Sequence, residues 1–284
     1  MSDVSDRAFS SILHPTDFSA SSHMAFEHAL KIAIANQSRF SISHVEKGKS
    51  DGPAWIEFPQ IRETLERWGL LPEGSSRHDV GEKLGVHVKK VDRISKTPLE
   101  AIVGFLEREH ADLIVLSTEG REGLPRWLRP SFSEALVRRS LTATLFVPAG
   151  TRGFVSRGSG EVRLSRILIP TDRKPYPGVG IDVAGGLLKS LSVPSPKIEA
   201  LYIGDLANMP AVNPPQDLDC SFEQTVRSGK PVDEIMQRAD ELEADLIVTV
   251  TEGHHGFLDA LRGSTTEQIV RRAPCPVLAV PAAG

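Results

Sequence analysis

Two aspartates are the first residues in this sequence that could do chemistry. Asp17 and Asp172 each end a Pro-Thr-Asp tripeptide that closes a short apolar run. A carboxylate in such a place can border a ligand, or it can accept a hydrogen bond from the free amides of a starting helix. Both interpretations stay open, because a capping aspartate can also contact a ligand.

A glycine-rich loop near the C-terminus is the second candidate. Gly253 and Gly256 are followed, after six intervening residues, by Gly263, Ser264 and Thr265. Glycines let backbone amides approach a phosphate closely. A helix that begins at Ser264 would also favour an anion at its N-terminus. The loop is therefore a candidate phosphate-binding site.

The corresponding loop nearer the N-terminus is a weaker candidate. It contains Gly120, Gly123 and Ser131, but Pro130 stands where the later copy has Gly263. Proline offers no amide and restricts the backbone. We therefore expect the earlier loop to hold a phosphate less well than the later one.

The serines of both loops also have a structural interpretation. Ser131 and Glu134, like Ser264 and Glu267, have the spacing of a capping box, which satisfies the amides at a helix N-terminus. Glu267 would in addition repel a nearby phosphate. Helix capping and phosphate binding therefore both stay open for these segments.

Metal and covalent chemistry find little support in the sequence. His254 and His255 lie near Glu252, but no spaced set of three or four ligands accompanies them, so no metal is expected. We find no Walker A, HExxH or Ser-His-Asp pattern. Cys275 enters an apolar run and is expected to be buried and inert.

The elements that position these candidates occur twice. Segment 98–148 aligns without a gap with segment 231–281, and the run at Ala111–Val115 recurs at Ala244–Val248. Matching blocks in the same order over two halves indicate a duplicated domain. We place the domains at residues 1–150 and 161–284, called here the first and second half.

The connection between the halves reads as a linker. Residues 149–160 are rich in Gly, Ser and Arg and have no periodic pattern. Such a composition predicts a flexible surface connection.

Within each half, short apolar runs alternate with helical patterns. One helix is expected to begin at Pro98, with Ile102, Val103 and Leu106 on one face. Strand–helix alternation predicts a doubly wound α/β fold, with a mostly parallel sheet and helices on both faces. Ligands of such sheets bind beyond the carboxyl ends of the strands, where the aspartates and the glycine loops lie.

The halves differ between their second and third strands. In the first half, residues 58–71 place Ile61, Leu65 and Trp68 on one helical face. In the second half, residues 204–218 are rich in proline and have no helical period. The second half is therefore expected to lack this helix.

Composition restricts the classes of partner. The chain has 284 residues, 40% of them hydrophobic and 25% charged, and a net charge of −4, which argues against a nucleic-acid-binding protein. No apolar run approaches the ~18–20 residues of a membrane span, and no signal peptide is visible. Two cysteines cannot form a disulfide framework, so a cytoplasmic protein is expected.

Taken together, the motifs resemble the universal stress protein family in its tandem two-domain form. They are the Pro-Thr-Asp tripeptides, the Ala-Asp-Leu-Ile-Val runs, the Gly-x-x-Gly loops, Ser43–Val45, Gly263-Ser264 and Ala273–Leu278. The resemblance implies, in each half, a five-stranded parallel sheet of order 3-2-1-4-5. It also implies that the halves pair through their fifth strands as an intramolecular pseudo-dimer, which is compatible with a further homodimer.

The family is divided into members that bind ATP and members that do not. The ATP-binding pattern is Gly, two residues, Gly, nine residues, Gly and then Ser or Thr; Gly253, Gly256, Gly263 and Ser264 match its fixed positions, although only six residues separate the second and third glycines. Asp172 matches the strand-one aspartate beside the nucleotide. The resemblance therefore implies ATP or AMP as cofactor, and the shorter loop argues against a triphosphate.

Three functions stay open. The first is a stress-response regulator that binds an adenine nucleotide, mainly in the second half, and acts through conformation or protein partners. The second is an interaction module that keeps the fold without the nucleotide. The third is a slow nucleotide hydrolase, for which the sequence supplies no assigned base, nucleophile or metal cage.

Overall fold

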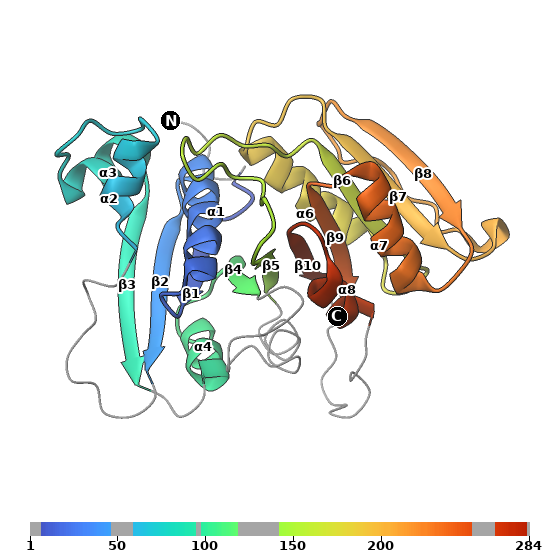
Figure 1. Cartoon of the computed structure of the whole chain (residues 1–284), viewed down its shortest axis with the longest axis horizontal. Helices are drawn as coiled ribbons and strands as arrows, with labels where there is room; N and C mark the ends of the chain where they lie inside the picture. The colour runs from blue at the N-terminus through green and yellow to red at the C-terminus, as the bar shows by residue number, and fades with distance from the viewer. Residues whose placement is uncertain (1–6, 47–58, 95–97, 119–141, 252–264, 283–284) are drawn as a thin grey trace.

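A computed structural model describes residues 7–46, 59–94, 98–118, 142–251 and 265–282 (Figure 1). Ten strands form one sheet of order β3-β2-β1-β4-β5-β10-β9-β6-β7-β8. Their bounds are β1 Ser11–Thr16, β2 Arg39–Glu46, β3 His87–Ile94, β4 Leu113–Thr118, β5 Ala143–Pro148, β6 Arg166–Thr171, β7 Lys197–Ile203, β8 Ser221–Arg227, β9 Leu246–Thr251 and β10 Val277–Pro281.

The helices of the described residues lie on both faces of this sheet. Their bounds are α1 Ala20–Asn36, α2 Ile61–Arg67, α3 Arg77–Leu84, α4 Pro98–Leu106, α6 Gly178–Ser190, α7 Pro231–Leu242 and α8 Thr265–Arg272. The apolar side chains of α1, α2 and α6 join one buried cluster, and those of α4, α7 and α8 join the other. The expected arrangement of helices on both faces is confirmed.

The two halves have the same strand order. Each follows the expected 3-2-1-4-5 order, and every strand pair within a half is parallel. The fifth strands, β5 and β10, pair antiparallel, with Phe146 opposite Val277 and Leu145 opposite Leu278. The expected pairing of the halves through their fifth strands is therefore confirmed.

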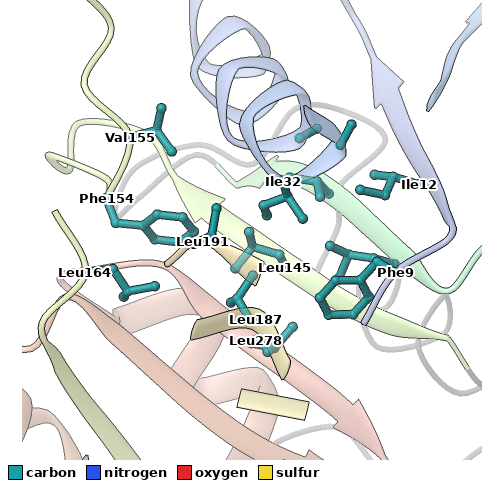
Figure 2. Packing of buried hydrophobic residues seen from close by; sticks show 14 of the residues in the cluster. Phe9, Ile12, Ile32, Leu145, Phe154, Val155, Leu164, Leu187, Leu191 and Leu278 are labelled. Carbon is teal, nitrogen blue, oxygen red and sulfur yellow. The ribbon is translucent and has the colours of Figure 1, made fainter. Parts of the chain in front are cut away.

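A continuous hydrophobic core crosses this junction. Figure 2 shows Leu145 of β5 and Leu278 of β10 packed with Leu187 of α6 and with Phe9, which precedes β1. These side chains are at most 3% exposed. Burial of apolar surface therefore joins the halves in addition to the strand hydrogen bonds.

The connection between the halves is not the flexible surface segment that its composition predicts. Phe154 is 0% and Val155 is 4% exposed, and both belong to the core that spans the halves (Figure 2). Their backbone amides donate to Nε2 of His28, at 2.9 and 3.2 Å. Gly153 makes this possible, because its φ is +62° and a Cβ there would lie 2.5 Å from the His28 ring.

The second-half segment between β7 and β8 contains no α-helix, as expected. It forms a single 3₁₀ turn at Leu206–Asn208 and then runs extended through its prolines. Val212 is buried in the core, and Pro215 packs where a side chain on Gly185 of α6 would otherwise lie. In the first half, α2 forms as predicted, with Ile61, Leu65 and Trp68 buried.

Helix α3 was not predicted from the sequence. Its signals are a complete capping box between Ser76 and Asp79 and the left-handed Gly85 after its last turn. Only Val80 of this short helix is buried, so the hydrophobic period that identifies longer helices is absent.

Candidate functional site

In the first half, Asp17 lies directly after β1 and does not itself cap α1. The cap residue is Ser19, whose Oγ accepts a hydrogen bond from the amide of Ser22 at 3.1 Å. Asp17 Oδ1 in turn accepts from the amide and the hydroxyl of Ser19, at 3.0 and 2.6 Å. The interpretation of Asp17 as the N-cap of α1 is therefore wrong. Its carboxylate instead orients Ser19, which is the residue that caps the helix.

An aromatic pair connects the ends of β1 and β2 in the first half. The ring of Phe18 stacks on that of His44, with centroids 4.1 Å apart and planes 21° apart. The Nδ1 atom of His44 lies 3.0 Å from the carbonyl oxygen of Thr16. Side chains of the protein itself thus cover this part of the carboxyl edge, a feature that no sequence motif indicated.

A buried neutral histidine lies beneath α1 next to this edge. His14 is 0% exposed, and its Nδ1 lies 2.9 Å from the carbonyl oxygen of Val115. Burial lowers the pKa of His14 to about 4, although the hydrogen bond to Val115 and the charge of Asp17 oppose this shift. The ring therefore supplies no positive charge to the site at neutral pH.

In the second half, Asp172 is more accessible than its counterpart. The residue is exposed, and its Oδ1 accepts from the amide of Arg173 at 2.6 Å. Among the described residues it forms no ion pair. Pro177 occupies the N-cap position of α6 and makes no side-chain cap. Asp172 is therefore not a cap, and its carboxylate is open to a ligand.

The fourth strand of each half ends in a threonine whose hydroxyl has no hydrogen-bond partner among the described residues. Thr118 ends β4 and Thr251 ends β9, and these residues are equivalent in the duplication. The Oγ1 atom of each is buried and has no hydrogen-bond partner within the part of the chain that the structure describes. A buried hydroxyl without a partner loses free energy, so each position is suited to a hydrogen bond from a ligand or a water.

The helix after the second-half loop begins at Thr265, which is exposed. The hydroxyl of Thr266 lies 3.3 Å from that of Thr249, which attaches the start of α8 to β9. Glu267 pairs with Arg271 at 4.0 Å, so the negative charge expected to repel a phosphate is partly offset. The structure thus places Thr251, Thr249 and the start of α8 in one region.

The remaining predicted site residues lie outside the described residues. They are Gly120, Gly123, Ser131, Gly253, Gly256, Gly263 and Ser264. The phosphate-binding role of the two glycine loops therefore stays a prediction.

Cys275 is buried as expected, and burial raises the pKa of its thiol to about 12. Within the described ranges, no three His, Cys, Asp or Glu side chains gather as a metal site would require. Nor does any helix in those ranges have the length and apolar character needed to cross a membrane.

Comparison with known proteins agrees with this architecture. The sequence model of the universal stress protein family matches residues 8–148 and 197–281. A universal stress protein of Methanocaldococcus jannaschii is 44% identical over 144 residues, which is 50% of this chain and 84% of that protein.

Two solved structures share the fold over almost the whole chain. A universal stress protein of Archaeoglobus fulgidus superposes with a TM-score of 0.63 at 16% identity, covering 96% of this chain and 99% of that one. A protein of unknown function from Pseudomonas aeruginosa superposes with a TM-score of 0.59 at 16% identity, covering 99% and 95%. With the family matched in both halves, the chain belongs to the universal stress protein family.

Proposed function

We propose that this universal stress protein is a cytoplasmic regulator that binds an adenine nucleotide in its second half. The observation that carries the proposal is the buried Thr251 hydroxyl at the end of β9, which has no hydrogen-bond partner among residues 7–46, 59–94, 98–118, 142–251 and 265–282. Ligands of parallel α/β sheets bind beyond the carboxyl ends of the strands, which is where this hydroxyl lies.

In the proposed complex, the start of α8, Thr251 and Asp172 contact different parts of the nucleotide. The start of α8, near Thr265, is the positive end of the helix dipole, which favours a phosphate group. The Thr251 hydroxyl donates to a phosphate or ribose oxygen. The carboxylate of Asp172 accepts from a ribose hydroxyl or from the amino group of adenine. The short glycine loop between Gly256 and Gly263 favours AMP over ATP.

The first half is the poorer site for three reasons. Asp17 already accepts two hydrogen bonds from Ser19. The stacked rings of Phe18 and His44 cover the ends of β1 and β2. Pro130 also removes an amide from the loop. We therefore expect one nucleotide per chain.

Calorimetric titration of AMP, ADP and ATP tests the proposal. Thr251→Val keeps the shape of the side chain and removes the hydroxyl, so it should weaken nucleotide binding about tenfold. Asp172→Asn and Gly263→Pro should also weaken it. Thr118→Val and Asp17→Asn make the same changes in the first half and should leave the affinity unchanged.

The outcome also separates the alternatives. If no nucleotide binds at millimolar concentration, the proposal fails and the chain is an interaction module that retains the fold. If both sets of variants weaken binding equally, the assignment to the second half is wrong. Steady-state phosphate release that Asp172→Ala abolishes would instead identify a nucleotide hydrolase.

A further inference from the structure

A cavity of about 500 Å³ lies in the first half, between β3 and the two short helices α2 and α3. None of the residues that line it belongs to the proposed nucleotide site. Its volume falls within the range of small-molecule sites. Three cations and an apolar floor define it: Arg62, Arg77, Lys90, Ile61, Val80 and Val88.

The three cations reach the cavity from three different elements. Arg62 lies in α2, Arg77 begins α3, and Lys90 lies in the middle of β3. Arg62 is held in place, because its Nη1 donates to the carbonyl oxygen of Ser75 at 3.0 Å. The positive charges therefore converge on the same space as the valine side chains.

The local field is positive. Lys90 is half-buried, and burial lowers the pKa of its ammonium group; the charges of Arg77 and Arg62 lower it further. Two nearby carboxylates interact with other groups. Asp79 pairs with Lys83 at 2.8 Å, and Glu66 accepts from the amide of Ser75 at 3.2 Å.

The second half fills the equivalent place differently. The strand registers place Gln224 of β8 at the position equivalent to Lys90. Its Nε2 donates to the carbonyl oxygen of Pro210 at 3.3 Å, so the proline-rich segment lies where the first half has helices. The cavity is thus a property of the half that retains α2 and α3.

We propose that this cavity binds a small amphipathic anion. A carboxylate or phosphate head group lies between Arg62, Arg77 and Lys90, where a planar guanidinium can bind two oxygens at once. A hydrocarbon or aromatic body of the ligand packs on Val80 and Val88. Neither feature suffices alone, because a wholly polar anion leaves the apolar floor exposed to water.

Calorimetry with the full chain and three probes tests this proposal. Decanoate and decyl phosphate share a tail and differ in their head group, and decanol has the same tail without a charge. We expect the better anion to bind at least about tenfold more tightly than decanol. Its affinity should fall as salt is added.

Neighbouring lysines provide a matched pair of variants. Lys90→Met should weaken binding about tenfold. Lys89→Met makes the same change on the opposite face of β3, where Lys89 pairs with Glu109 at 2.6 Å, and should leave binding unchanged. Arg77→Met, on an exposed residue, repeats the test if Lys90→Met lowers stability. Val88→Phe should block the tail.

Four results would overturn the inference: no anion binds, decanol binds as tightly as the anions, Lys89→Met weakens binding as much as Lys90→Met, or Thr251→Val weakens it. The last result would assign the anion to the nucleotide site. Nucleotide binding without any binding of the amphiphiles would refute this inference alone and leave the proposed function standing.

Discussion

The two halves share a strand order but cover their outer strands differently. In the first half, α2 and α3 lie over β3 and leave a cationic cavity. In the second half, a proline-rich segment packs on α6, and a network of ion pairs joins β7 and β8 to α7. The same strand order is therefore compatible with helices or with a proline-rich segment over the outer strands. The side chains of each half determine which of the two arrangements forms.

The two halves also differ in how well each stabilises the ionised form of a buried glutamate. Burial raises the pKa of Glu27 in α1, although Arg67 and Arg157 oppose the shift. Burial also opposes ionisation of Glu199 in β7, but hydrogen bonds from Arg238 and Thr225 outweigh it, and the pKa is lowered. The first half stabilises its carboxylate less completely than the second.

Truncation of the linker aromatic should have the largest effect. Phe154→Ala removes a fully buried ring between the halves and should lower the free energy of unfolding by about 3–5 kcal/mol. Urea unfolding measures this change. Leu206→Ala, at a side chain 72% exposed in the second half, should stay within about 0.5 kcal/mol. A loss below about 1 kcal/mol for Phe154→Ala would mean that the linker does not hold the halves together.

Removing the arginine partner of each buried glutamate should destabilise the second half more than the first. Arg238 binds both oxygens of Glu199, at 2.8 and 2.7 Å, so Arg238→Met leaves a buried carboxylate and should cost about 3 kcal/mol. Arg67→Met should cost about 1 kcal/mol, because Glu27 can take up a proton and Arg157 remains 3.8 Å away. Equal costs in urea unfolding would refute the contrast.

Acid should destabilise the protein through buried histidines of the first half. Burial lowers the pKa of His28 and of His14 to about 4, so both rings stay neutral in the folded state while the unfolded chain takes up protons near pH 6.5. The stability that they contribute is present above about pH 6.5 and is lost as the pH falls towards 4. Each should remove about 2 kcal/mol between about pH 7 and pH 5.

Variants of two histidines check this dependence. His28→Gln should remove about half of the contribution that the two buried rings make to the pH dependence of unfolding. His78→Gln changes an exposed histidine and should leave it as it is. An unchanged pH profile in His28→Gln would show that this ring does not carry the effect.

Variants at the N-termini of α1 and α6 should give the smallest difference in stability between the halves. Ser19→Ala removes the cap of α1 and should cost about 1 kcal/mol. Asp172→Ala, before the uncapped α6, should stay within about 0.5 kcal/mol. Thermal unfolding at neutral pH distinguishes the two. An equal loss in both would show that Asp172 supports its own half structurally.

Most of the fold could be predicted because the duplication repeats its apolar patterns. The alternation of apolar runs and helical patterns predicted a mostly parallel sheet with helices on both faces, and the family resemblance implied the strand order. Ile102, Val103 and Leu106 are buried as their spacing requires. The linker could not be predicted from local composition. Burial of Phe154 depends on His28, which lies 126 residues away in the sequence.

The site was predicted only in part. The Pro-Thr-Asp repeat located Asp17 and Asp172, but their different surroundings come from Ser19 and from the Phe18–His44 stack, which have no repeat signal. Thr118 and Thr251 could have been found, because both begin the repeated Thr-Glu-Gly tripeptide. The roles of the glycine loops stay predictions.

The antiparallel contact of β5 with β10 has a consequence for assembly. Two separate domains would meet at a rate set by protein concentration, and dilution would part them. Here both strands belong to one chain, so the effective concentration of one half around the other is fixed by the connection. The two halves of this protein should therefore stay joined at any dilution, and two edges that could recruit other strands are sealed within the molecule.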